Sequence, residues 1–222
     1  RTLQLASVLG TEFTAPLLDA IGPPGADLAS DLAALVRLEL FRERGVFPEA
    51  RYAFTHLLVR QVAYDALLLK ARAELHGRAA VALERLYADR VDEILRELAD
   101  HYAKSGEPGR ALHYLARAGD RAASLFAYEE ACAFYRRALA LLDRSAEAAA
   151  DRARLLERLG DAAFGQGAVG EARARWLETL ALVNDGGDRR RIADVHRKLG
   201  VAAWTAGDRE GALAHLRQGI QS

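Results

Sequence analysis

One spacing of residues recurs three times in the second half of the chain, and it restricts the possible fold more than any other feature. Each copy begins with a large residue, at Leu95, Leu156 or His196. A leucine and a small residue follow within one helical turn, and a glycine, an alanine and a second large residue come later at the same offsets in every copy. This spacing predicts pairs of helices joined by tight turns, stacked as tetratricopeptide-type hairpins in an α-solenoid.

The residue types at the repeated positions have physical reasons. A small residue after the leucine lets two helix backbones approach closely, and a glycine tolerates the positive φ that ends the first helix. A large residue on the second helix is expected to fill the space between repeats. Because one hairpin cannot bury its apolar face alone, neighbouring hairpins must stack. The small residues are Ala99, Gly160 and Gly200, and the turn glycines are Gly106, Gly167 and Gly207.

A fourth copy of the spacing overlaps the first and begins at Leu115. Its turn, Phe126-Ala127-Tyr128, lacks the glycine, so this match is the weakest. The helix near 107–125 is expected to serve two hairpins. The predicted repeat array covers residues 91–222, with hairpins near 93–125, 107–143, 152–184 and 190–222.

Residues 1–90 follow a different pattern. Short helices are predicted at 3–9, after a cap at Thr14, and at 27–39. A short β-hairpin follows at 40–54, turning around Gly45 and Pro48. Three short helices and a hairpin are the order of a winged helix, and linker helices complete the region. The predicted fold is therefore mainly all-α: a winged-helix-like module in residues 1–90, followed by the α-solenoid.

A winged helix raises the alternative of a DNA-binding segment of a transcriptional regulator. In such proteins the third helix presents Arg, Lys, Asn or Gln to the bases. The third helix here contains a single arginine, Arg37, against Asp27, Asp31 and Glu39, and it has no amide side chain. Lys plus Arg equals Asp plus Glu at 31 each, so the chain has no general attraction for nucleic acid or anionic membranes. These features speak against DNA and favour a protein-packing role.

The sequence contains no recognisable catalytic or metal site. It has no GxxxxGK(S/T) phosphate loop, no HExxH motif and no paired cysteines with zinc spacing. Cys132, the one cysteine, is predicted to be a small buried apolar residue. The remaining histidines are expected to lie separately at half-buried or surface positions of helices, without shared ligand spacing: His76, His101, His113, His196 and His215. We therefore expect no enzyme activity, cofactor or metal in this chain.

Three segments carry a resemblance to a known family: FTHLLVRQVAYDALL at 54–68, RAELHGRAAVALE at 72–84, and the run from Leu98 to Leu142. They resemble the region downstream of the nucleotide-binding domain in bacterial STAND-type signalling ATPases. These include proteins that pair adenylate cyclase domains with a predicted ATPase, and related LuxR-type regulators. The resemblance implies a piece of a longer cytoplasmic protein that binds ATP or ADP elsewhere, and the absence of an initial Met agrees with that expectation.

The same resemblance implies a role for His56. In the family, a winged-helix histidine of an MHD-like motif reaches the phosphates of the bound nucleotide. Thr55-His56-Leu57 stands at the matching place, with leucine where the motif has aspartate. The residues alone favour a helix-capping or core histidine instead.

Taken together, these features predict a non-catalytic regulatory and protein-interaction segment of a larger signalling ATPase. Its partners would be a protein or peptide, the parent's own ATPase domain, or both, and no membrane span is expected. Partners of such arrays bind the groove formed by the first helices of the repeats. Arg189-Arg190-Arg191 is expected to be solvated, with contact to an acidic partner as the alternative. The groove candidates are Tyr102, Arg158, Asp161, Arg197 and Trp204.

Overall fold

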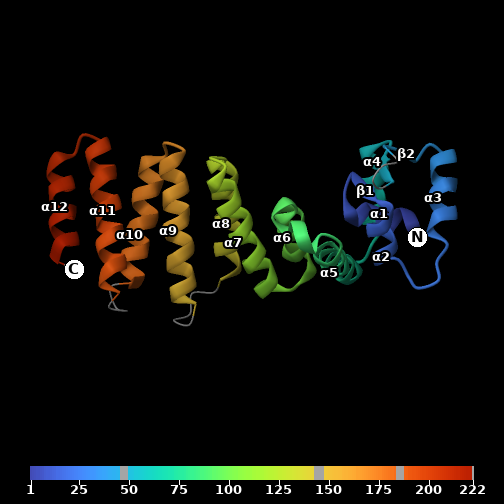
Figure 1. Cartoon of the computed structure of the whole chain (residues 1–222), viewed down its shortest axis with the longest axis horizontal. Helices are drawn as coiled ribbons and strands as arrows, with labels where there is room; N and C mark the ends of the chain where they lie inside the picture. The colour runs from blue at the N-terminus through green and yellow to red at the C-terminus, as the bar shows by residue number, and fades with distance from the viewer. Residues whose placement is uncertain (46–49, 143–147, 184–187, 222) are drawn as a thin grey trace. The chain divides into compact units, whose positions relative to one another are not determined.

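A computed structural model describes residues 1–45, 50–142, 148–183 and 188–221 (Figure 1). The chain divides into two compact units, residues 1–111 (unit 1) and 112–222 (unit 2). The predicted turn at Pro48 and the predicted hairpin ends at 143, 184 and 222 lie outside the described residues. No helix in the described ranges combines the length and apolar character needed to cross a membrane.

Unit 1 begins with three short helices and three short strands, in the order helix, strand, helix, helix, hairpin. The strands form an antiparallel sheet in the order β1-β3-β2, with Glu12 opposite Ala53 and Phe41 opposite Phe54. Short helices and a small antiparallel sheet thus make up the first part of unit 1. The elements are α1 (Thr2–Leu9), β1 (Glu12–Thr14), α2 (Ala15–Ile21), α3 (Leu28–Arg37), β2 (Phe41–Glu43) and β3 (Arg51–Phe54).

The strand β1 was not predicted from the sequence. Three residues are too few to show the alternation of a strand, and β1 exists because its backbone pairs with that of β3. The predicted cap is confirmed directly after it, since the Thr14 hydroxyl oxygen accepts a hydrogen bond from the Leu17 amide at 3.4 Å. One face of the sheet packs in the core through three phenylalanine rings, whose centroids lie 4.8 to 6.3 Å apart: Phe13, Phe41 and Phe54.

Helices complete unit 1, and a buried polar cluster joins three of them. The Nδ1 atoms of His76 and His101 lie 3.0 Å apart, and His76 Nε2 lies 2.9 Å from the Tyr64 hydroxyl. Both imidazoles are buried, which corrects the expectation that these histidines lie separately at half-buried or surface positions. The elements are α4 (Leu57–Asp65), α5 (Leu69–Leu86), a 3-10 segment (Ala88–Glu93), α6 (Leu95–Ser105) and the start of α7 (Pro108–Ser124).

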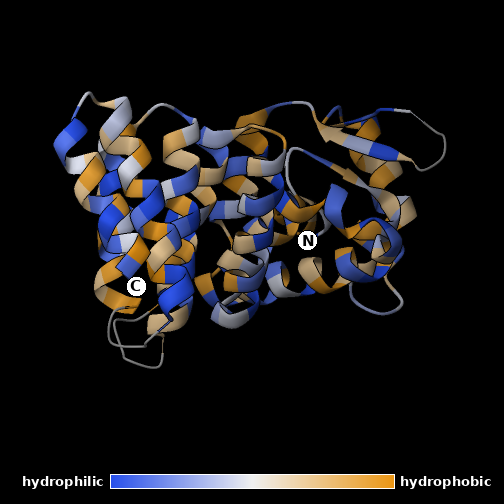
Figure 2. Cartoon of the chain, turned by 60° about the vertical axis from the view of Figure 1, so that its left-hand side comes forward, coloured by the Kyte–Doolittle hydropathy of each residue, from blue (hydrophilic) through white to orange (hydrophobic). Residues whose placement is uncertain are grey.

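Unit 2 consists of helices that pack on their neighbours in the sequence. Figure 2 shows orange and blue residues interspersed along the helices, and the buried positions of unit 2 are mostly apolar. The predicted α-solenoid is present, and Cys132 is buried as predicted. The helices are the rest of α7, α8 (Tyr128–Leu141), α9 (Ala149–Gly165), α10 (Val169–Val183), α11 (Arg189–Thr205) and α12 (Arg209–Gln221).

The small repeat residues in unit 2 are needed for contact within a hairpin. A Cβ atom on Gly160 would lie 2.5 Å from the Trp176 indole nitrogen, and one on Gly119 would lie 2.5 Å from the Tyr135 ring. The second large residue of each repeat therefore covers the small residue of its own hairpin. This corrects the expectation that the large residue only fills the space between repeats.

The turns confirm the predicted positive φ at Gly106, Gly167 and Gly207, which have φ of 81, 86 and 81°. Phe126 occupies the corresponding position of the overlapping copy and also has a positive φ, 60°. The same backbone bond closes three of these turns: Ala127 N–H reaches Ala122 O, Ala168 N–H reaches Ala163 O, and Asp208 N–H reaches Ala203 O. The hairpin geometry therefore imposes a left-handed residue even where the sequence supplies no glycine.

Candidate functional site

An open groove of about 830 Å³ lies in unit 2 along the first helices of two successive hairpins, α9 and α11. Its lining is almost entirely charged, with Ala193 as the single apolar residue. We call it the α9–α11 groove. Its lining residues are Arg154, Glu157, Arg158, Asp161, Asp188, Arg190, Arg191, Ala193, Asp194 and Arg197.

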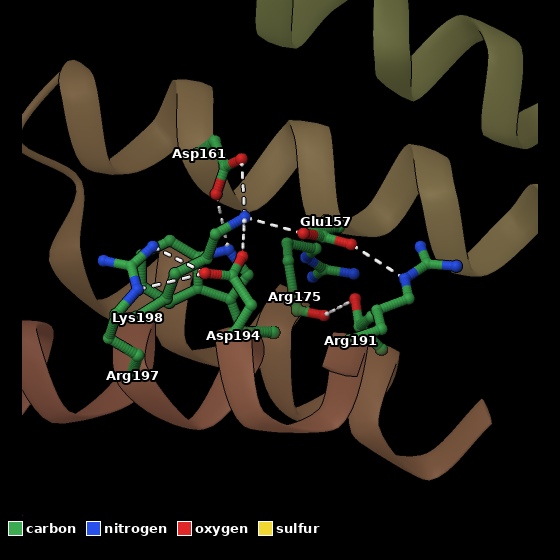
Figure 3. Close-up of polar contacts among 9 residues, drawn as sticks. Glu157, Asp161, Arg175, Arg191, Asp194, Arg197 and Lys198 are labelled. Atoms are coloured by element: carbon green, nitrogen blue, oxygen red, sulfur yellow. Dashed lines mark hydrogen bonds and ion pairs between the residues drawn. The ribbon is translucent and has the colours of Figure 1, made fainter. Parts of the chain in front are cut away.

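Lys198 of α11 does not line the groove itself, but it bonds three of the carboxylates that do (Figure 3). Its Nζ lies 2.7 Å from Glu157 Oε1, 2.9 Å from Asp161 Oδ2 and 3.4 Å from Asp194 Oδ2. Burial alone would lower the pKa of Lys198, but the bonds to Glu157 and Asp161 outweigh it and raise that pKa. One ammonium group thus links α9 to α11 and compensates carboxylates from both helices.

Two further donors hold the carboxylates of α9. Arg191 Nε donates to Glu157 Oε2 at 2.9 Å, and the Trp176 indole N–H donates to Asp161 Oδ1 at 3.0 Å. Burial raises the pKa of Asp161 above its ordinary value, with the bonds from Lys198 and Trp176 acting in the opposite direction. The second large residue of this repeat, Trp176, therefore also orients a groove carboxylate.

Three residues predicted from the sequence line this groove: Arg158, Asp161 and Arg197. Arg197 donates through both Nε and Nη2 to Asp194 Oδ1, at 3.0 and 2.7 Å. Arg158 Nη1 lies 3.1 Å from Asp120 Oδ2 in an ion pair whose partners are both nearly half exposed.

The other two groove candidates lie elsewhere. Trp204 is 65% exposed near the end of α11, and Arg209 lies over its ring at 6.0 Å, but it is not among the groove lining. Tyr102 belongs to unit 1 and has no exposed surface. Its hydroxyl accepts a bond from Arg110 at 2.7 Å. The expectation of a partner-facing Tyr102 is wrong, because its position on α6 points into the core.

His56 stands at the N-terminus of α4 with its side chain exposed. Its ring does not cap the helix, so the capping and core interpretations that the residues alone favoured are both wrong. The helix that follows presents large apolar side chains to solvent: Leu57 is 68%, Leu58 73% and Val62 61% exposed. We call these three residues the α4 apolar face. Contiguous exposed apolar residues of this kind are found at sites that contact proteins, membranes or ligands.

Sequence reasoning missed Glu157, Asp194 and Lys198. It expected Arg191 to be solvated, whereas this side chain is only 18% exposed because it pairs with Glu157. A signal for some of the missed residues was present in the repeats, because Glu157 and Arg197 occupy the same offset in successive copies and carry opposite charges. Comparing charges between equivalent positions of neighbouring repeats would have pointed to the groove. Within the described ranges, no group of three or more His, Cys, Asp or Glu side chains is placed to hold a metal ion.

The hairpins, their turns and the groove between first helices define the C-terminal part of the chain as an α-solenoid of the tetratricopeptide type. No family model matches the chain. A relative from Rhizobium meliloti (strain 1021), uncharacterized protein R02095, is 32% identical over 169 residues. The matched region covers 74% of this chain and 16% of the relative, so the chain spans a small part of that protein's length.

Solved structures of MamA align with this chain only at low TM-scores. One MamA crystal structure aligns with a TM-score of 0.42 and 17% identity, covering 66% of this chain and 87% of MamA. Another solved structure, MamA MSR-1 C2, aligns with a TM-score of 0.40 and 23% identity, covering 73% of this chain and 96% of that one. Since these TM-scores are low, the assignment of the fold rests on the helices and turns of this chain.

Proposed function

We propose that this chain is a non-catalytic regulatory and protein-interaction segment of a larger cytoplasmic signalling ATPase. The observation that carries the interaction part of the proposal is the α9–α11 groove, an open surface of charged side chains on the first helices of the repeats. The ATPase part rests on the resemblance of residues 54–68, 72–84 and 98–142 to the STAND-type family. Such a surface suits an extended or helical protein segment, whereas pockets for small organic molecules are mostly apolar. The groove would bind a protein partner or another part of the parent protein.

Unit 1 would carry the regulatory part of this function. The α4 apolar face is an exposed surface of Leu57, Leu58 and Val62 directly after the exposed His56. We propose that this face packs on the ATPase domain of the parent protein and that His56 approaches the nucleotide there. The imidazole and the free amides of the helix N-terminus would both favour the phosphate charge.

Site-specific photocrosslinking tests the interaction function. A photoreactive residue replaces Arg197 in the groove, and a control places it at Arg217, an exposed position on α12 outside the groove lining. We expect a discrete crosslinked product in cells of the source bacterium from the Arg197 position, identified by mass spectrometry, and none from Arg217. Equal labelling from both positions would refute a specific groove.

The non-catalytic part of the proposal has its own test. The purified chain is incubated with Mg²⁺ and ATP, and released phosphate is measured over time. No turnover above the protein-free blank is expected, since the sequence lacks a phosphate-binding loop. Appreciable turnover would contradict the proposal.

A further inference from the structure

The carboxylates and the arginines of the α9–α11 groove differ in how fully they are bonded within the protein. Asp188 accepts from the Arg191 amide at 3.1 Å, and it caps α11. Glu157, Asp161 and Asp194 are each bonded to Lys198 and to one further donor. Every carboxylate of the groove therefore already has a positively charged or N–H partner.

Two arginines have close partners: Arg191 Nε donates to Glu157, and Arg197 donates to Asp194 although 59% of its side chain is exposed. The other donors of the groove arginines have weaker partners or none. Arg190 is exposed and has no hydrogen-bond or ion-pair partner in the described part of the chain. Arg191 Nη2 also lacks an acceptor there, although it is shielded from solvent. Arg154 lies 3.4 Å from Asp151 with 65% of its side chain exposed, and Arg158 pairs with Asp120 at the surface. Exposed pairs of this kind contribute little and exchange partners readily.

The arginines are also arranged in two rows. Arg154 and Arg158 are four residues apart on α9, and Arg190 and Arg197 are seven apart on α11, so each pair lies on one face of its helix. Both rows line the same groove. Five arginines and four carboxylates line the groove, and Lys198, bonded to Glu157, adds a further positive charge beside it. The surface left for a ligand is therefore positive, although the whole chain is neutral.

We propose that the α9–α11 groove binds an acidic peptide segment, whose Asp and Glu carboxylates bond to Arg154, Arg158, Arg190 and Arg197. The guanidinium group favours this ligand because its planar N–H donors match a carboxylate in two parallel bonds. The near absence of apolar lining argues for a charged, extended segment over an amphipathic helix, which needs an apolar groove. This inference rests on the proposed interaction function and names the chemistry of its partner.

The test measures binding of the whole chain to a fluorescein-labelled peptide of alternating glutamate and alanine, about twelve residues long, by fluorescence anisotropy. A lysine-alanine peptide of the same length is the charge control. We expect the glutamate peptide to bind at least roughly tenfold more tightly than the lysine peptide, with affinity falling as NaCl is raised. Equal binding of the two peptides would overturn the inference.

Matched variants locate the binding site. The double substitution R190E/R197E is expected to weaken binding of the glutamate peptide by roughly tenfold or more, since it reverses two charges of the groove. R217E reverses one exposed charge on α12 outside the groove, and it is expected to change affinity less than about twofold. Circular dichroism melting confirms that each variant is folded. An unchanged affinity in R190E/R197E, or an equal loss in R217E, would refute the assignment.

The outcomes separate this inference from the proposed function. If crosslinking at Arg197 is specific to the groove but the glutamate peptide is not preferred, the interaction function is supported and the acidic ligand is refuted. If no groove-specific crosslinking is found, the interaction function itself is refuted, regardless of the affinity measured for the glutamate peptide.

Discussion

Lowering the pH should destabilise unit 1 through the buried pair His76 and His101. Burial, with His101, Lys104 and Arg60 adding to it, lowers the pKa of His76 to about 3. Burial and Lys104, opposed by Asp100, lower the pKa of His101 to about 4. In the neutral pair one Nδ1–H donates to the other Nδ1, and His76 Nε2 bonds to Tyr64. Protonating both rings would place two N–H groups face to face at 3.0 Å.

The size of the effect follows from proton linkage. An unfolded histidine has a pKa of about 6.5, so it binds a proton at pH 5 that the folded ring does not. Because the folded pKa lies below the unfolded one, stability falls as pH drops through about 6.5 and levels off near the folded pKa. At pH 5 the loss is about 2 kcal/mol for each ring, or about 4 kcal/mol for the pair, compared with pH 8.

Urea unfolding followed by circular dichroism at pH 8, 6 and 5 measures this loss, and hydrogen exchange of α5 and α6 peptides places it in unit 1. The double variant H76Q/H101Q removes both titrating rings, and it should show a much flatter pH profile than the unsubstituted chain. H113Q replaces an exposed histidine and is the matched control. If the H76Q/H101Q profile runs parallel to that of the unsubstituted chain, the buried pair is not the cause.

Three substitutions test the packing, each by urea unfolding. Phe126→Gly should raise the unfolding free energy by roughly 0.5–1 kcal/mol, because it relieves a positive φ in a non-glycine residue; destabilisation would contradict that reason. Gly160→Ala should cost about 2 kcal/mol, since its Cβ would lie 2.5 Å from Trp176, and an unchanged midpoint would exclude the close contact. Lys198→Met should cost about 2–3 kcal/mol by leaving three carboxylates without their shared cation; a neutral effect would show that the network is not stabilising.

The sequence predicted those parts of the fold that depend on local geometry. A helix repeats every few residues and its end requires a particular φ, so the spacing of leucines and glycines located hairpins and turns without knowledge of any distant contact. The Thr14 cap follows the same logic, since its oxygen bonds to an amide three residues later. Arg158, Asp161 and Arg197 could be placed on one surface because equivalent repeat positions lie on equivalent faces of successive helices.

Contacts between distant residues were decided by the tertiary structure. His76 and His101 are 25 residues apart, and Lys198 and Glu157 are 41 apart. Whether such side chains meet depends on how neighbouring helices are rotated and offset, which no local pattern specifies. The same packing buried Tyr102 and paired β1 with β3. The sequence by itself thus determined a repeated helical array with its turns, because those depend on backbone period and φ. Only the tertiary structure decided which charges compensate each other, because that depends on how neighbouring helices are placed.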